Sequence, residues 1–174
     1  MRIAEAVQFI QNAFFTSENP QIWADLGCGN GVFTFALAQL LPAGSTIYAV
    51  DRVSQKFSAQ IENGVNIHFI KADIEKSELH LPKLNGIIVA NALHYVKKQS
   101  LKIIQLEEHF EQNKKFIIIE YDSTFSNQWV PYPIPFSTLK QLFPSDKYEI
   151  TKIAERSSIY GQGNMYCALI TTKN

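Results

Sequence analysis

Three glycines occupy alternate positions in the segment WADLGCGNGVF. Gly27, Gly29 and Gly31 carry no Cβ, so the backbone can adopt positive φ there and another molecule can lie directly against the main chain. A tight turn that binds nothing would use the same residues. The dinucleotide-binding fingerprint GxGxxG needs a glycine where Val32 stands, so the GxGxG spacing weakens a dinucleotide interpretation. Asp25, two residues ahead of Gly27, either contacts a ligand or fixes the loop by accepting backbone N–H bonds.

Two further carboxylates follow apolar runs in the same half of the chain. Asp51 stands in AVDR, 20 residues after the last of these glycines, where a carboxylate can accept hydrogen bonds from both hydroxyls of a ribose. Asp73 stands in KADI, after the next apolar run. Each side chain has an alternative role as a helix cap, Asp51 for a helix that begins near Val53 and Asp73 for one that begins at Ile74.

His94, in the segment ANALHYV, is a candidate general base. The reference pKa of histidine lies near neutrality, which suits removal of a proton from the hydroxyl group of a substrate. The alternative is a ring that holds a loop by hydrogen bonding. His68, His80 and His109 have no metal-ligand spacing with one another or with the two cysteines, so we expect no metal site.

Short apolar runs precede these candidate residues and are typical of strands covered on both faces. Helical patterns separate the runs, most clearly at 31–41 and 97–110. Such alternation predicts right-handed βαβ units and a parallel sheet, whose carboxyl ends would bring the candidate residues to one edge. The predicted strands are IWADL (22–26), TIYAV (46–50), NIHFI (66–70), GIIVAN (86–91) and KFIIIEY (115–121).

The two ends of the chain carry further elements. An amphipathic helix is predicted before Asn19-Pro20, and a short helix at 137–143. The runs YEITKIAER (148–156) and NMYCALITT (164–172) are joined by too few residues for a crossover helix, which predicts an antiparallel hairpin at the sheet edge. The predicted apolar stripes are Ile3, Val7, Ile10 and Phe14, with Ala6 and Ala13, in the first helix, and Leu101, Ile104 and Glu108, with Ile103, Leu106 and Phe110, in 97–110.

Four segments in register, WADLGCGNG, AVDR, KADI and ANALHYV, resemble the motifs of the class I S-adenosylmethionine-dependent methyltransferases. The resemblance covers about residues 20–122. It implies a Rossmann-like, doubly wound α/β fold with helices on both faces of a mostly parallel seven-stranded sheet that ends in an antiparallel hairpin. It also implies S-adenosylmethionine as methyl donor and S-adenosylhomocysteine as product. One departure is that only residues 71–85 join the third and fourth strands, so the usual helix there must be short, distorted or absent.

The resemblance also implies a role for each motif. The glycine loop and the segment after the fourth strand would hold the methionine part, Asp51 the ribose, and Asp73 with Ile74 the adenine. Cys28 would contribute its backbone alone, because no histidine or second cysteine stands nearby to activate the thiol. The implied cofactor-binding residues are Asp25, Gly27, Cys28, Gly29, Gly31, Asp51, Arg52, Asp73, Ile74, Asn91 and Ala92.

The acceptor is predicted to be a small, partly apolar molecule. Base methyltransferases commonly carry an Asn/Asp-Pro-Pro-aromatic segment after the fourth strand, whereas NALHY has no proline, and a net charge of zero gives no field for phosphates, so nucleic acid is disfavoured. The prolines and aromatic residues of 121–136 form a candidate lid, with ordinary loop packing as the alternative. The candidate acceptor contacts are His94, Tyr95, Trp129, Tyr132 and Tyr160.

Length and composition predict one domain over residues 1–174. It would comprise an N-terminal helix in 1–19, a cofactor-binding core in 20–122, and an acceptor loop with the hairpin in 123–174. Two cysteines far apart suit reduced thiols in a cytoplasmic protein, and neither a signal peptide nor a membrane span is expected. Two alternatives stay open: a protein that binds S-adenosylmethionine without transferring its methyl group, and a nucleotide- or NAD-binding domain.

Overall fold

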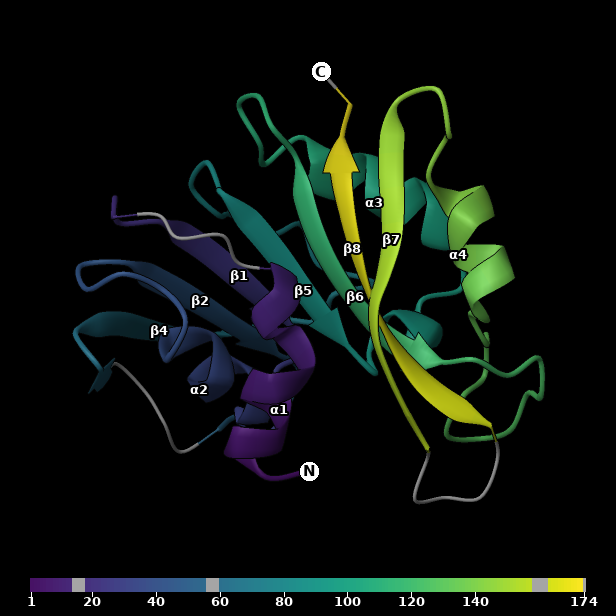
Figure 1. Cartoon of the computed structure of the whole chain (residues 1–174), viewed down its shortest axis with the longest axis horizontal. Helices are drawn as coiled ribbons and strands as arrows, with labels where there is room; N and C mark the ends of the chain where they lie inside the picture. Colours follow the sequence, from purple (N-terminus) through teal and green to yellow (C-terminus); the bar gives the residue numbers. More distant parts are fainter. Residues whose placement is uncertain (14–17, 56–59, 158–162, 174) are drawn as a thin grey trace.

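An eight-stranded sheet runs through the computed structural model, which describes residues 1–13, 18–55, 60–157 and 163–173 (Figure 1). The strand order is β3-β4-β2-β1-β5-β6-β8-β7, with β4, β2, β1, β5 and β6 parallel and β3, β8 and β7 antiparallel to their neighbours. The predicted mostly parallel sheet with an antiparallel C-terminal hairpin is confirmed, and β3 adds one short edge strand. The strands are β1 (Ile22–Leu26), β2 (Thr46–Asp51), β3 (Gln60–Glu62), β4 (Val65–Lys71), β5 (Gly86–Ala90), β6 (Lys115–Tyr121), β7 (Tyr148–Ser157) and β8 (Asn164–Thr172).

The central strands are apolar throughout because both of their faces are covered. In β6, Phe116 and Ile118 pack into one core, Ile117 and Ile119 pack into the other, and all four are buried. The bounds predicted for β1, β6 and β8 are confirmed residue for residue.

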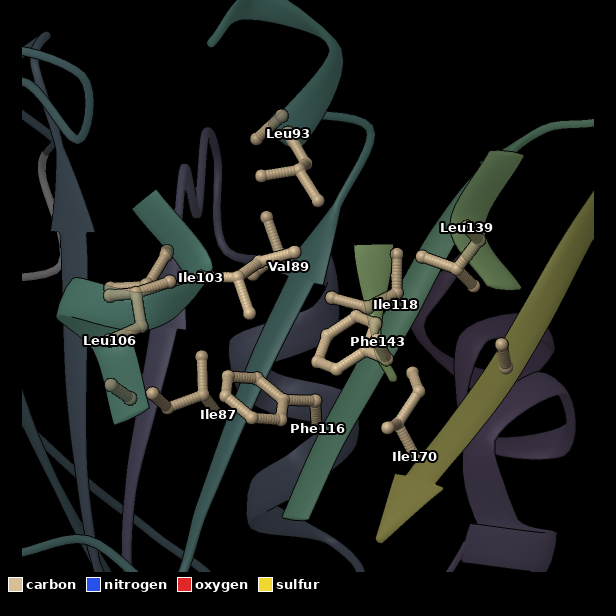
Figure 2. Packing of buried hydrophobic residues seen from close by; sticks show 14 of the residues in the cluster. Ile87, Val89, Leu93, Ile103, Leu106, Phe116, Ile118, Leu139, Phe143 and Ile170 are labelled. Atoms are coloured by element: carbon tan, nitrogen blue, oxygen red, sulfur yellow. The ribbon is translucent and has the colours of Figure 1, made fainter. Parts of the chain in front are cut away.

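Helices cover both faces of this sheet, as predicted. α1 (Ile3–Ile10), the 3₁₀ turn η1 (Gln11–Ala13) and α2 (Val32–Ala38) pack on one face, and η2 (Leu93–Tyr95, also 3₁₀), α3 (Gln99–Glu107) and α4 (Phe136–Leu142) pack on the other. Figure 1 shows α1 beside α2 on the near face. Figure 2 shows the core that contains Phe116 and Ile118, where side chains around α3 and α4 meet those of β5, β6 and β8. The labelled residues are Ile87, Val89, Leu93, Ile103, Leu106, Phe116, Ile118, Leu139, Phe143 and Ile170.

The buried stripe of α1 differs from the predicted one. Ala6, Ile10 and Ala13 are buried as predicted, but Phe9 is buried in addition and Ile3 is exposed. The buried set has helical spacing of its own, runs from α1 into η1, and packs in the same core as the buried residues of α2. Val7 is half-buried against this core, and Phe14 lies outside the described residues.

Half of the stripe predicted for α3 faces water. Ile103, Leu106 and Phe110 are buried as expected, but Leu101 and Ile104 are exposed. The two sets lie on different faces of the helix, and only the first can reach the sheet. The prediction of a broad buried stripe was therefore wrong for Leu101 and Ile104.

The connection between β4 and β5 contains no helix over residues 72–85. A single turn at 74–76 is closed by the Ser77 N–H, which donates to the Asp73 carbonyl at 2.8 Å. Leu79 and Leu84 then anchor the segment in the core. The expectation that the usual helix is short, distorted or absent is confirmed.

Candidate functional site

A cavity of about 340 Å³ lies where the strand order reverses. β1 and β5 are neighbours, yet the chain passes from β1 to β2 on one side and reaches β5 on the other, so the loops after the two strands diverge. Open α/β sheets bind ligands at such a switch point, outside the carboxyl ends of the strands. The wall contains Gly27 and Gly29 after β1, Asn91 after β5, and residues of β6, β8 and β7.

The glycine loop depends on backbone shapes that other residues rarely adopt. Gly27 has a φ of 75°, and a Cβ built on it would lie 2.3 Å from the Ala92 Cβ. Gly29 has a φ of 52°, and a Cβ there would meet nothing within 4 Å. The two positions therefore differ: Gly27 is needed for close packing inside the protein, whereas Gly29 presents bare backbone to the cavity that it lines.

Asp51 holds this loop in place. Its Oδ2 accepts a hydrogen bond from Gly29 N at 2.8 Å, and its Oδ1 accepts one from Val53 N at 2.9 Å. The segment 52–55 is not helical, so Asp51 closes a local turn there instead of capping a helix. Each carboxylate oxygen can accept a second bond, which leaves capacity for a hydroxyl pair. Arg52 is exposed.

Asp73 is engaged in its own turn. Its Oδ1 accepts from Glu75 N at 2.9 Å and from Lys76 N at 3.4 Å, while Ile74 packs against the hydrophobic core. Neither Asp73 nor Ile74 is part of the cavity wall. Asp73 therefore closes a turn instead of capping the helix that the sequence left open, because no helix forms there, and the adenine contact stays a prediction.

Asp25 lies behind the loop. It is 1% exposed, its Oδ2 accepts from the Thr34 hydroxyl at 2.6 Å, and its Oδ1 has no hydrogen-bond partner in the described part of the chain. Burial raises the pKa of Asp25 to about 7; the Thr34 hydrogen bond opposes this rise and the charge of Asp51 adds to it. A carboxylate in this position ties β1 to α2, and its contact with a ligand stays a prediction.

Asn91 combines a left-handed backbone with an unsatisfied side-chain oxygen. Its φ is 50°, which costs a residue with a Cβ roughly 1–2 kcal/mol. Its Nδ2 donates to Met165 Sδ at 3.6 Å, whereas its buried Oδ1 has no partner within the described ranges. Strained backbone and a lone acceptor in a cavity wall are typical of a ligand site.

His94 is paired with Glu120, a residue that the sequence analysis did not single out. The ring Nδ1 lies 2.6 Å from Glu120 Oε2, the His94 backbone N–H donates to Oε1 at 3.2 Å, and both side chains are buried. His94 is not in the cavity wall. The contacts match the predicted loop-holding role, because they tie the turn after β5 to β6; the role as a base stays a prediction. The only sequence signal for Glu120 is an acid inside the apolar run KFIIIEY.

The predicted acceptor contacts are spread over the surface. Trp129 is 69% exposed, and Tyr95 and Tyr132 are also exposed and do not line the cavity. Tyr160 lies outside the described residues. Tyr121, the first residue of the predicted lid, does line the cavity, together with three side chains that the sequence did not indicate, namely Met165, Arg156 and Ser157.

The described residues show neither an activated thiol nor a cluster of metal ligands. Both cysteines are buried free thiols, and burial raises the pKa of the Cys28 thiol well above its usual value, which makes it a poor nucleophile. Within the described ranges, no three His, Cys, Asp or Glu side chains gather as metal ligands would. No helix there has the length and apolar character needed to span a membrane.

Comparison with known proteins gives a consistent result. A family model described as a methyltransferase domain matches residues 22–168. None of the curated protein sequences matches the chain.

Solved structures resemble the fold at low sequence identity. A 1,6-didemethyltoxoflavin-N1-methyltransferase from Burkholderia thailandensis, solved with 1,6-didemethyltoxoflavin and S-adenosylhomocysteine bound, superposes with a TM-score of 0.71 at 14% identity over 99% of this chain and 78% of its own. A putative S-adenosylmethionine-dependent methyltransferase from Listeria monocytogenes superposes with a TM-score of 0.69 at 14% identity, over 98% of this chain and 100% of its own. An S-adenosylmethionine-dependent methyltransferase from Aquifex aeolicus superposes with a TM-score of 0.66 at 14% identity, over 97% of this chain and 88% of its own.

Proposed function

The chain belongs to the family of S-adenosylmethionine-dependent methyltransferase domains, and from this premise we propose that it transfers the methyl group to a small-molecule acceptor. One observation carries the proposal: Gly29 and Asn91, each with a positive φ, line one cavity at the switch point. Gly29 presents open backbone there, and Asn91 has an acceptor oxygen with no partner among the described residues. The residues present therefore fit a ligand that carries both a flat contact surface and a hydrogen-bond donor.

S-adenosylmethionine, when bound, supplies a methyl group on a sulfonium, which is an electrophile already activated. The protein then has to bind and orient two molecules, and orientation alone can contribute about 7–11 kcal/mol in well-aligned intramolecular reactions. We assign the glycine loop and Asn91 Oδ1 to the methionine part, whose ammonium is a donor. The free lone pairs of Asp51 would accept from the ribose hydroxyls, with Arg52 next to it in the chain. Ala92 would border the methionine part with Asn91, and Asp73 with Ile74 would serve the adenine.

The acceptor side supports a small substrate. The cavity of about 340 Å³ is at the lower end of the range for small-molecule sites, and Phe33, Tyr121 and Met165 give it partly apolar walls. The methyltransferase from Burkholderia thailandensis has a small molecule bound beside S-adenosylhomocysteine. A cytoplasmic location, proposed from the cysteines, agrees with two buried free thiols.

His94 is proposed to act on the acceptor only where a proton must leave. A ring whose Nδ1 faces Glu120 carries its lone pair on Nε2, which is the nitrogen that could take a proton from a hydroxyl. An amine acceptor would need no base.

Calorimetric titration with S-adenosylhomocysteine tests the assignment, and Asn91→Gly is the matched variant. Glycine adopts the same φ without strain, so this change removes Oδ1 with little effect on the backbone, and affinity should fall about tenfold. Asn63→Gly is the control, because Asn63 has the same φ of 50° in the turn between β3 and β4.

Binding measurements with NAD and S-adenosylhomocysteine, together with a methyl-transfer assay, distinguish the two alternative functions. Saturable binding of NAD without binding of S-adenosylhomocysteine would indicate a nucleotide-binding domain. Binding of S-adenosylhomocysteine, with no label passing from methyl-tritiated S-adenosylmethionine to any compound in a protein-free cell extract, would favour a non-catalytic binding protein.

A further inference from the structure

The cavity continues across the sheet, away from the glycine loop. Tyr121 at the end of β6 pairs with Met165 of β8, and Met165 pairs with Arg156 of β7. All three line the cavity together with Ser157. They form one row at the ends of three neighbouring strands, with the guanidinium at the edge farthest from β1.

Arg156 is the single ionised side chain in this wall. The remaining side chains of described residues that line the cavity are apolar or neutral, among them Cys28, Asn30, Phe33, Asn91, Tyr121 and Met165. The described residues of the wall include no carboxylate. The Arg156 side chain is 32% exposed, so water partly screens its charge, but among the described side chains of the wall its guanidinium alone can offer an anion two parallel, charge-assisted hydrogen bonds.

Arg156 forms a partly exposed ion pair with Glu5. Its Nη1 is 3.7 Å from Glu5 Oε2, beyond hydrogen-bond distance, and its guanidinium makes no hydrogen bond within the part of the chain that the structure describes, so the pair contributes little stability. Glu5 is already bound by Arg2, whose backbone N and Nε donate to it at 3.0 and 3.2 Å. Since Arg2 satisfies Glu5, the guanidinium of Arg156 can turn to a ligand at little cost.

We propose that the methyl acceptor carries a carboxylate or phosphate group and that Arg156 binds this group. The inference rests on the proposed function and adds the charge class of the acceptor. A planar guanidinium binds either anion with two parallel hydrogen bonds, which fixes orientation as well as charge.

The position of β7 favours the acceptor over the cofactor as the source of the anion. The cofactor site lies at the tips of β1 and β5, whereas β6 and β8 separate β5 from β7. Three strand spacings amount to about 14 Å. An acceptor placed along the row from Asn91 to Arg156 would have its reactive atom at one end and its anionic group at the other.

Benzoate and its neutral analogue benzamide are suitable probes, since both are small and aromatic and differ in charge. Their dissociation constants are measured by chemical-shift titration of the ¹⁵N-labelled full chain, with and without saturating S-adenosylhomocysteine. We expect benzoate to bind about tenfold more tightly than benzamide, Arg156→Gln to abolish the difference, and Arg156→Lys to keep part of it. Lys98→Gln is the control, because Lys98 is an exposed cation that does not line the cavity.

Equal affinities for the two probes, no saturable benzoate binding, or an unchanged benzoate affinity in Arg156→Gln would overturn the proposal. A loss of S-adenosylhomocysteine affinity in Arg156→Gln would also overturn it, because the arginine would then serve the cofactor's carboxylate. Failure of wild-type protein to bind S-adenosylhomocysteine refutes the proposed function instead, and the titrations without it still report on the anion site.

Discussion

Gly27 and Ala92 pack so closely that no side chain fits between the loop after β1 and the turn after β5. A Cβ on Gly27 would lie 2.3 Å from the Ala92 Cβ, and the φ of 75° adds backbone strain. We therefore expect Gly27→Ala to lower the free energy of unfolding by about 2–4 kcal/mol, measured by urea denaturation. Adding Ala92→Gly should recover the part due to the clash, and a double variant no more stable than Gly27→Ala alone would contradict this packing argument.

Gly29→Ala should affect binding of the cofactor more than it affects stability. The new Cβ meets nothing in the protein, so only the φ of 52° costs stability, about 1–2 kcal/mol. The methyl group enters the space where we place the cofactor, and affinity for S-adenosylhomocysteine should fall at least tenfold by calorimetry. Retained affinity would show that the ligand does not lie against this backbone.

Asp25 should make stability depend on pH near neutrality. Its folded pKa of about 7 lies above the ordinary value of 3.8, so the folded state holds the proton more tightly. The resulting stabilisation is complete below about pH 4 and is lost as the pH rises through 7, on the order of 4 kcal/mol in total. Asp25→Asn should flatten this slope and raise the free energy of unfolding at pH 8, whereas Asp146→Asn, at an exposed acid, should do neither.

Removal of the His94 ring should leave the buried Glu120 carboxyl with the backbone N–H of residue 94 as its remaining hydrogen-bond donor in the described ranges. Glu120 is 1% exposed, so leaving its Oε2 without a donor should cost about 3 kcal/mol and lower the Tm by roughly 10 °C in His94→Ala. Replacing both residues by leucine should cost less than this. Transfer activity that survives in a folded double variant would establish a structural role for His94 and exclude one as a base.

The strands were predictable because each is an apolar run bounded by turn residues, and β1, β6 and β8 needed nothing more. β3 was missed, since Gln60–Glu62 is too short to form a recognisable run. A signal was present in the Asn63-Gly64 pair, whose positive φ values of 50° and 76° suit a two-residue hairpin turn. The stripes of α1 and α3 failed where more than one apolar arc was available and only tertiary packing selected the buried one.

The site was predictable where one segment carries it, as in the glycine loop. Contacts between distant segments were not. Glu120 stands 26 residues after His94, and Arg156 reaches the cavity only because β7 and β8 pair in one register beside β6. No spacing rule in a single sequence encodes such a register, because the register is set only when all the strands of the sheet assemble.

Asp51→Ala should weaken binding of S-adenosylhomocysteine by tenfold or more, because charge-assisted hydrogen bonds are worth about 1.5–3 kcal/mol. The structure adds a second reason, since Asp51 also holds Gly29 N at 2.8 Å and its loss frees the loop. Asp51→Asn keeps an oxygen for the Gly29 N–H but loses the charge, so its affinity should fall between those of the wild type and the alanine variant. Asp146→Ala controls for the change in net charge at an exposed position. Unchanged calorimetric affinity in Asp51→Ala would show that Asp51 does not contact the ribose and only holds the glycine loop.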